Sequence, residues 1–204
     1  RRSMFDPEWL SADDPRLAPS TRLGDTWAAI ASTDGPELRD ARAQMRELLA
    51  TRPLPLDRSE RPGHFTGSAL VVDPDSRRTL LLLHATLGIW VQPGGLADGD
   101  ANLASVALRE ATEETGIEGL RVWPEAIDLD VHVVDPPAED VHLHHDVRFL
   151  VVAPAGAVAT INHESHDHRW VGSDDLDELG VDAGTRRLVA AGLAQLDRLA
   201  AGPG

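Results

Sequence analysis

The chain has 204 residues, enough for one domain with a sizeable core and an additional segment. Its 19 basic residues, all arginine, stand against 34 acidic ones, and the net charge of −15 argues against nucleic acid or an anionic membrane as the main partner. The lack of cysteine excludes disulfides and zinc–thiolate sites, and no apolar run approaches the roughly 20 residues of a membrane span. No apolar signal-peptide region precedes the domain, so we expect a cytoplasmic protein.

Residues 4–60 are polar, interrupted by prolines, and predicted to form a helical extension. Within residues 36–50, Leu38, Met45 and Leu48 recur at helical spacing. No group of residues suited to catalysis occurs here. We expect the extension to pack on the core, cover the site or form a homodimer, and we expect residues 61–202 to fold without it.

From His64 onward the pattern changes to strands. The predicted strands cover residues 65–72, 79–84, 87–91, 127–134, 141–152 and 169–171. Asp73-Pro74-Asp75-Ser76 is a turn sequence and predicts a hairpin between the first two. A central helix after residue 100 and a closing amphipathic helix over residues 182–200 complete the pattern. Together these elements predict an α/β/α sandwich with a mixed sheet.

The most informative segment spans residues 94–117. Glu110, Glu113 and Glu114 are spaced i, i+3, i+4 and therefore lie on one face of a helix. Like charges at this spacing cost about 0.2–0.5 kcal/mol per pair, and only Arg109 is adjacent to compensate. Hard oxygen ligands without a balancing cation in the sequence indicate a cation from solution, most naturally Mg²⁺.

The same segment resembles the signature of the Nudix hydrolases. That signature reads Gly, five residues, Glu, seven residues, Arg-Glu, an apolar residue, any residue, Glu-Glu, any residue, Gly, an apolar residue. The matching positions are Gly95, Arg109, Glu110, Ala111, Glu113, Glu114, Gly116 and Ile117. The first glutamate of the signature is replaced by Ala101. The resemblance implies the Nudix fold, Mg²⁺ as cofactor with Mn²⁺ as a substitute, and hydrolysis of a diphosphate linkage in a nucleoside diphosphate derivative or nucleotide.

The resemblance also implies residue roles. Glu110, Glu113 and Glu114 would bind the metal, with one glutamate acting as general base, and Arg109 would orient a carboxylate. The carbonyl of Gly94 is an expected additional ligand, because glycine permits close approach. Glu164, in the loop before the last strand, would act as base or further ligand; a solvated loop glutamate is the equal alternative.

Ala101 supports a second interpretation. The chain would then be a catalytically weak or inactive Nudix-like module that binds a nucleotide as a sensor. Asp98 and Asp100 lie close enough in sequence to replace the missing carboxylate. Alternatively, both aspartates simply stabilise the beginning of the helix.

Two strands near residues 130 and 145 carry an unusual set of polar side chains. If the strands pair antiparallel, alternation brings these side chains onto one face of the sheet. We predict that this face binds phosphate or ribose; a transition metal held by imidazole, or a purely structural polar face, are the alternatives. The predicted substrate-binding residues are His132, His142, His144, Asp146 and Arg148, with Asp130 beside them.

Overall fold

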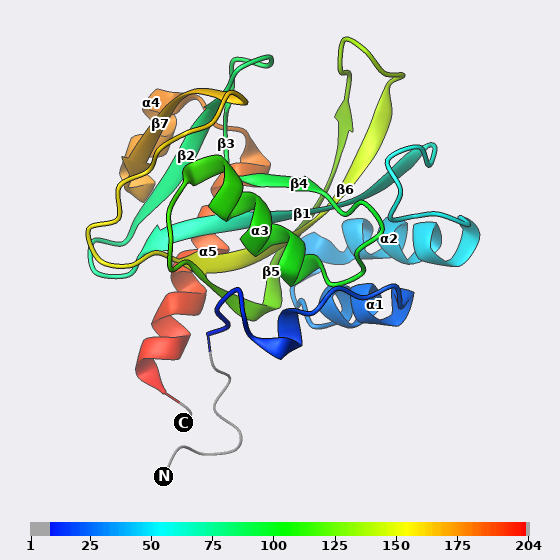
Figure 1. Cartoon of the computed structure of the whole chain (residues 1–204), viewed down its shortest axis with the longest axis horizontal. Coiled ribbons are helices and arrows are strands. Elements are labelled where there is room, and N and C mark those ends of the chain that lie inside the picture. The colour runs from blue at the N-terminus through cyan, green and yellow to red at the C-terminus, as the bar shows by residue number, and fades with distance from the viewer. Residues whose placement is uncertain (1–8, 203–204) are drawn as a thin grey trace.

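The computed structural model describes residues 9–202, which form a mixed sheet with helices on both of its faces (Figure 1). The helices are α1 (Leu23–Ala31), α2 (Arg39–Thr51), α3 (Leu103–Thr115), α4 (Leu176–Leu179) and α5 (Ala183–Ala201). The strands are β1 (Gly63–Asp73), β2 (Arg78–His84), β3 (Trp90–Val91), β4 (Gly94–Leu96), β5 (Arg121–Val134), β6 (His142–Val152) and β7 (Ser165–Val171). Short 3₁₀ turns occupy Pro15–Leu17, Pro36–Leu38 and Ser173–Asp175.

Strand β1 is the centre of the sheet. It runs parallel to β6 along nearly its whole length, from Gly63 opposite Leu143 to Val72 opposite Val152, and β5 pairs antiparallel on the far side of β6. Its other edge is shared between two partners: β4 pairs with its first half and β2 with its second half. The predicted β1–β2 hairpin is confirmed, whereas β4, with the sequence Gly-Gly-Leu, is a strand outside the predicted set.

Alternation along β1 sends its side chains to two different cores. Phe65, Ala69 and Val71 pack with α3 on one face, while Leu70 and Val72 pack with α5 on the other. The predicted α/β/α sandwich with a mixed sheet is therefore confirmed. Within residues 9–202, no helix combines the length and the apolar character needed to cross a membrane.

The N-terminal extension is helical, as predicted, and it shares the core on the α3 face. Ile30, Met45 and Leu48 are buried in the same apolar cluster as the α3 side chains. Leu10 forms an antiparallel bridge with Val122 of β5. This packing argues against the expectation that residues 61–202 fold alone.

A truncation inside this shared core tests the packing. Met45 is fully buried, so we expect Met45→Ala to lower the free energy of unfolding of the whole domain by about 2–5 kcal/mol. Glu47→Ala, on the exposed side of the same helix, is the matched control and should change it by less than about 0.5 kcal/mol. Chemical denaturation measures both. Equal effects of the two substitutions would show that α2 is not part of the cooperative core.

Candidate functional site

Helix α3 carries the three signature glutamates, and its ends are well defined. The Asn102 side chain accepts a hydrogen bond from the Ser105 N–H (3.4 Å) at the first turn. Gly116 ends the helix in the left-handed conformation, with φ of 63°. The apolar residues of α3 are buried against the sheet, so the register of the helix fixes where its carboxylates lie.

Strand β4 lies directly against these carboxylates. The Gly94 N–H donates a hydrogen bond to Glu114 Oε1 (3.2 Å), and Glu114 is only 8 % exposed. A Cβ on Gly95 would collide with the carboxylate of Glu110. A side chain at Gly95 would therefore displace the Glu110 carboxylate, and a Cβ on Gly94 would collide with Cβ and Cα of Ser68, so glycine at these positions allows the strand to lie against both β1 and the acidic helix.

The site is negatively charged and partly buried. Burial, together with the negative charges of Glu164, Glu110 and Glu113, raises the pKa of Glu114 to about 8. Burial also raises the pKa of Glu110, against the opposing effect of its hydrogen bond from Arg109 (3.0 Å). Among the described residues, Arg109 is the one basic side chain bonded to these carboxylates.

The loop before β7 brings Glu164 to the same region. Its charge acts on both Glu110 and Glu114. The backbone of Glu164 is fixed on both sides: its carbonyl accepts from the Ala85 N–H and its N–H donates to Asn162 Oδ1, each at 2.9 Å. The role of Glu164 as base or ligand stays a prediction, but its position agrees with that role.

This group of oxygen donors fits a hard divalent cation. Carboxylates with few cationic partners, lined by a glycine backbone, are the ligand set that Mg²⁺ and Mn²⁺ prefer. The residues that could hold the ion are Glu110, Glu113 and Glu114, with the backbone of Gly94 beside them. A bound cation would remove the mutual repulsion of the carboxylates.

Ala101, which replaces the first glutamate of the signature, is fully buried beneath the N-terminal extension. Its N–H donates to the carbonyl of Ser20 (2.6 Å), and its carbonyl accepts from Thr26 Oγ1 (3.0 Å). The extension therefore covers the position where the glutamate would stand.

The two nearby aspartates have structural partners instead. Asp98 forms an ion pair with Arg58 (2.7 Å). Asp100 accepts hydrogen bonds from the N–H groups of Ser20 (3.0 Å) and Asn102 (2.9 Å). These contacts favour the structural interpretation of both aspartates over replacement of the missing carboxylate.

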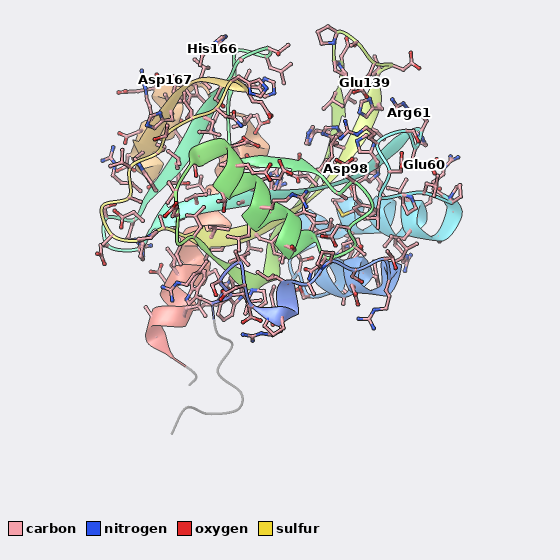
Figure 2. The ribbon with its side chains drawn as sticks, in the orientation of Figure 1. Glu60, Arg61, Asp98, Glu139, His166 and Asp167 are labelled. Carbon is pink, nitrogen blue, oxygen red and sulfur yellow. The ribbon has the colours of Figure 1, made fainter. Side chains whose placement is uncertain are left out.

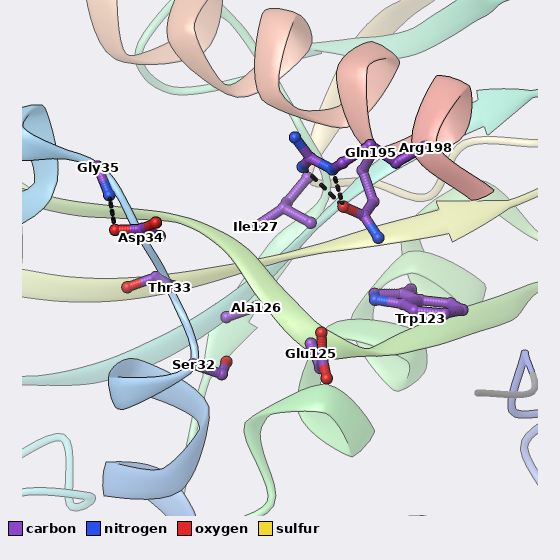
Figure 3. A pocket seen from close by; sticks show the side chains of 10 residues that line it. All are labelled: Ser32, Thr33, Asp34, Gly35, Trp123, Glu125, Ala126, Ile127, Gln195 and Arg198. Atoms are coloured by element: carbon purple, nitrogen blue, oxygen red, sulfur yellow. Dashed lines mark hydrogen bonds between the residues drawn. The ribbon is translucent and has the colours of Figure 1, made fainter. Parts of the chain in front are cut away.

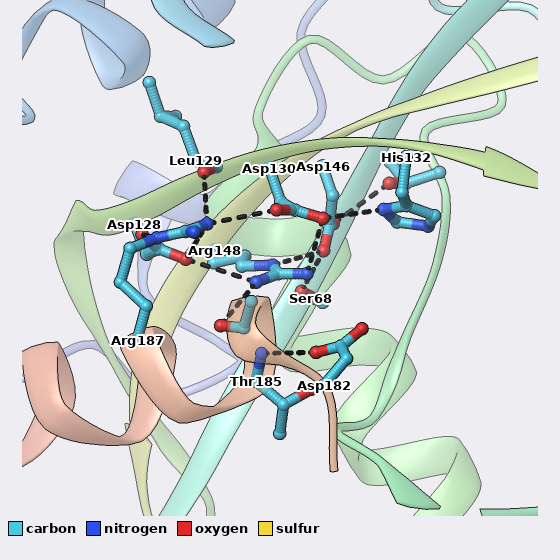
Figure 4. A network of polar contacts seen from close by, with 12 residues as sticks. Ser68, Asp128, Leu129, Asp130, His132, Asp146, Arg148, Asp182, Thr185 and Arg187 are labelled. Atoms are coloured by element: carbon cyan, nitrogen blue, oxygen red, sulfur yellow. Dashed lines mark hydrogen bonds and ion pairs between the residues drawn. The ribbon is translucent and has the colours of Figure 1, made fainter. Parts of the chain in front are cut away.

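The polar face of the sheet forms as the pairing hypothesis required, with Asp130 opposite Asp146 and His132 opposite His144. Figure 4 shows that its centre is a network of ion pairs. Arg148, only 3 % exposed, contacts three carboxylates, on Asp128, Asp130 and Asp146, at 2.8–3.2 Å.

Arg187 of α5 closes this network by pairing with Asp128 (2.7 Å). The sequence did not predict that α5 takes part, because the contact joins residues 59 positions apart. The side chains of Asp146 and Arg148 are thus fully engaged inside the protein. This geometry favours the structural alternative for these two residues, and their contact with substrate stays an untested prediction.

The histidines lie at the end of the same face. His132 is held by Asp130 (2.9 Å); burial alone would lower its pKa, but the hydrogen bond to Asp130 and the negative charges of Asp146 and Asp130 together outweigh burial and raise it. Burial lowers the pKa of His144 to about 3 and also lowers that of His64, so these rings are neutral near pH 7. Neutral rings bring no positive charge to a phosphate. His64, which the sequence analysis missed, joins the group because β1 runs parallel to β6.

Two surface pockets lie elsewhere on the described chain. One, of about 370 Å³, opens between β5, α5 and the loop after α1 and includes Trp123 and Arg198 (Figure 3). The other, of about 760 Å³, lies between the N-terminal segment and the start of α3. Neither of these two pockets is lined by Glu110, Glu113 or Glu114.

The burial of Ala101 leads to a testable expectation. Ala101→Glu would place a carboxylate beneath the extension without a partner, so we expect the free energy of unfolding to fall by about 3 kcal/mol or more. Thr21→Glu adds the same charge at an exposed position of the extension and should have an effect below about 0.5 kcal/mol. Chemical denaturation curves of both variants measure these two changes in the free energy of unfolding. Similar stability of the two would mean that the extension opens readily over Ala101.

Comparison with known proteins agrees with this geometry. A family model described as the NUDIX domain matches residues 64–191. In sequence, the chain is 32 % identical over 120 residues to "Putative 8-oxo-dGTP diphosphatase 3" of Mycobacterium tuberculosis. This alignment covers 54 % of this chain and 52 % of that protein. It is 30 % identical over 124 residues to CMP-5'-(N-acetyl-N-hydroxy-3-aminopropyl)phosphonate hydrolase of Streptomyces rubellomurinus, which covers 57 % of each chain. The chain thus spans only a little over half the length of these curated relatives.

Solved structures share the fold at low sequence identity. A C. elegans Ap4A hydrolase aligns with a TM-score of 0.54 at 17 % identity, covering 65 % of this chain and 97 % of that one. The NUDIX domain of Shewanella oneidensis NrtR, solved with ADP ribose, aligns with a TM-score of 0.53 at 17 % identity. The alignment covers 74 % of this chain and 97 % of that one. Because the family model covers more than half of the chain and the acidic helix has the geometry of the signature, this protein belongs to the Nudix family.

Proposed function

We propose that this protein is a Mg²⁺-dependent hydrolase that cleaves a diphosphate linkage in a nucleoside diphosphate derivative or a nucleotide. One observation carries the proposal: Glu110, Glu113 and Glu114 converge with Glu164 beside the glycine strand β4, with a single arginine among them. Such concentrated negative charge is costly in a metal-free protein and useful for binding a cation.

Each residue of the acidic site has a separate proposed role. Glu110, Glu113 and Glu114 would hold the ion, and Arg109, which donates a hydrogen bond to Glu110, would fix the orientation of that carboxylate. A bound divalent cation supplies charge neutralisation for the diphosphate and makes a bound water more acidic. Glu164 would accept the proton of the water that attacks phosphorus, and its charge acting on Glu110 and Glu114 supports this role; Glu113, exposed on α3, is the alternative proton acceptor.

The class of substrate follows from the relatives. One curated relative is named for 8-oxo-dGTP and another for a CMP-linked phosphonate, so both names contain a nucleotide joined through phosphorus. We therefore propose a nucleotide-containing substrate. A panel of nucleoside triphosphates, 8-oxo-dGTP, nucleotide sugars and ADP-ribose, each with Mg²⁺ and with Mn²⁺, tests this proposal.

Ala101 supports the second candidate function, a nucleotide-binding sensor with little or no hydrolysis. The extension occupies the place of the first signature glutamate, and the nearby aspartates do not replace it. Metal-dependent release of phosphate or nucleotide product from the panel supports the enzyme. Binding of the same compounds without product release supports the sensor.

The carboxylates on α3 give a direct test. We expect Glu113→Gln combined with Glu114→Gln to reduce Mg²⁺-dependent turnover by about 100-fold or more, because both changes remove metal ligands. Glu118→Gln, an exposed substitution just after the helix, is the control and should keep wild-type turnover. Circular dichroism checks that the fold is intact. Substantial turnover in a folded double variant would place the metal site elsewhere.

The buried Glu114 gives a second test, which does not require a substrate. Because its pKa is raised to about 8 in the folded protein, ionisation disfavours the folded state, and metal-free stability falls as pH rises from about 4.5 towards 8. We expect Glu114→Gln to raise the free energy of unfolding in EDTA at pH 8 by at least about 1 kcal/mol, and to change it little at pH 5, where the carboxyl group is protonated.

The exposed Glu113→Gln is the matched control in the same measurements. It should show a smaller gain at pH 8. If Glu114→Gln has the same effect at both pH values, Glu114 is ionised in the folded protein without cost.

A further inference from the structure

Three histidines from two strands meet at the beginning of β1, on the sheet face that also carries α5. His64 lies opposite His144 in the parallel β1–β6 register, and His142 stands two residues before His144 on the same face. The ring centres are 4.9, 5.0 and 5.2 Å apart, a nearly equilateral triangle. One ring nitrogen from each lies within 4.8 Å of the others.

This spacing matches three imidazoles around one small ion. With a metal–nitrogen bond of about 2.0–2.1 Å, tetrahedral ligation places ring centres about 5 Å apart and ligand nitrogens about 3.4 Å apart. The rings are therefore already at the required separation. The three nitrogens, which lie within 4.8 Å of one another, would have to approach to about 3.4 Å to share an ion.

The hydrogen bonding of the rings leaves nitrogens free for ligation. His64 is 1 % exposed, yet among the described residues neither of its ring nitrogens has a hydrogen-bond partner of normal geometry; the Glu60 backbone lies close enough to act on its pKa. A buried polar atom without a partner costs about 1–3 kcal/mol. An ion would provide the missing partner.

His142 is arranged as ligating histidines usually are. Its Nδ1 lies 2.7 Å from the carbonyl of Asp140, to which it donates, so Nε2 remains as the free ligand atom. A backbone carbonyl on the second ring nitrogen is the usual way in which a protein fixes the tautomer and the orientation of a metal-bound imidazole.

The chemistry of the cluster selects the class of ion. All three ligands are neutral nitrogen donors, which suit Zn²⁺, Cu²⁺ or Ni²⁺ and not Mg²⁺ or Ca²⁺. A set of three histidines leaves a fourth position for water. We infer that His64, His142 and His144 bind one divalent transition-metal ion, Zn²⁺ being the best match, at a site separate from the carboxylates of α3.

The two sites are too far apart to share an ion. Ser68 pairs with Gly94 of the acidic site, and His64 stands four residues earlier on β1. At about 3.3 Å per residue, the separation along the strand is about 13 Å. The inference therefore goes beyond the proposed diphosphate chemistry and does not depend on it.

The position of the cluster indicates what the ion would do. His64 begins β1, and His142 begins β6 directly after the β5–β6 hairpin, whose Glu139 is paired with Arg61 (3.5 Å). Figure 2 shows Arg61 and Glu139 together at this end of the molecule. An ion here would join the two central parallel strands at their N-terminal ends and anchor the base of the hairpin.

The test uses the full chain without an affinity tag, carrying Glu113→Gln and Glu114→Gln so that the acidic site does not compete. After EDTA treatment and desalting, Zn²⁺ is titrated calorimetrically in excess Mg²⁺, and Co²⁺ is added separately to record the visible spectrum. We expect one equivalent of Zn²⁺ to bind and Co²⁺ to give the intense bands of four-coordinate geometry. The melting temperature should rise with Zn²⁺ but not with Mg²⁺.

Variants assign the ligands. His64→Gln combined with His144→Gln should weaken Zn²⁺ binding by at least about 100-fold and abolish the Co²⁺ bands. His166→Gln, on the exposed end of β7, is the matched control and should retain both. Zn²⁺ affinity that is unchanged in the His64 and His144 variant, or lost in the His166 variant, would overturn the inference.

Because His64 is buried, the variant with both His64 and His144 replaced could fail to fold, and a second measurement keeps the inference testable in that case. The Zn²⁺ stoichiometry and the Co²⁺ spectrum of the protein that retains all its histidines do not depend on any substitution in the cluster. If no ion binds there in the presence of Mg²⁺, or if Co²⁺ gives only the weak bands of six-coordinate geometry, the inference fails whatever the variants do.

Discussion

The close approach of the β4 backbone to the acidic face of α3 is the constraint on which this structure depends. β4 pairs with the first half of β1, and this pairing holds Gly94 and Gly95 against Glu114 and Glu110. Burial and the neighbouring carboxylates raise the pKa values of Glu110 and Glu114, and the hydrogen bond from Gly94 partly offsets this effect for Glu114. The unfavourable electrostatic energy thus lies among the carboxylates of α3, and the shared edge of β1 keeps β4 in register with them.

The N-terminal extension explains how the signature departs from the family pattern. Ser20 and Thr26 bond to the backbone of Ala101, and the short side chain leaves room for the extension to lie on the loop before α3. A signature position that serves the site in other family members here serves packing. The glutamates of the signature keep their positions because the apolar residues of α3 pack against the sheet and Asn102 caps the N-terminal end of the helix.

Much of the fold was predictable from the sequence because its signals are local. Alternation predicted β5 and β6, the Asp-Pro turn predicted the β1–β2 hairpin, and the spacing of glutamates predicted one acidic helix face. The missed features are contacts between distant residues. β4 has a glycine-rich sequence with no strand signal, and His64 joins His144 only through the parallel register of β1 and β6. The partners of Ala101, and Arg187 as a partner of Asp128, lie more than fifty residues away.

The network around Arg148 has a consequence for how this protein can evolve. Arg187 pairs with Asp128, Asp128 and Asp146 pair with Arg148, and Asp146 accepts a hydrogen bond from Ser68, which lies opposite Gly94. Loss of Arg148 removes a buried positive charge that three carboxylates share, whereas exchange of the whole set for apolar residues of similar volume need cost little. Mutation proceeds one residue at a time, so every path to that apolar alternative passes through an unstable intermediate. The network is thus conserved by the order in which substitutions can occur as well as by its own stability, and it links α5 to the β1–β4 edge beside the acidic site.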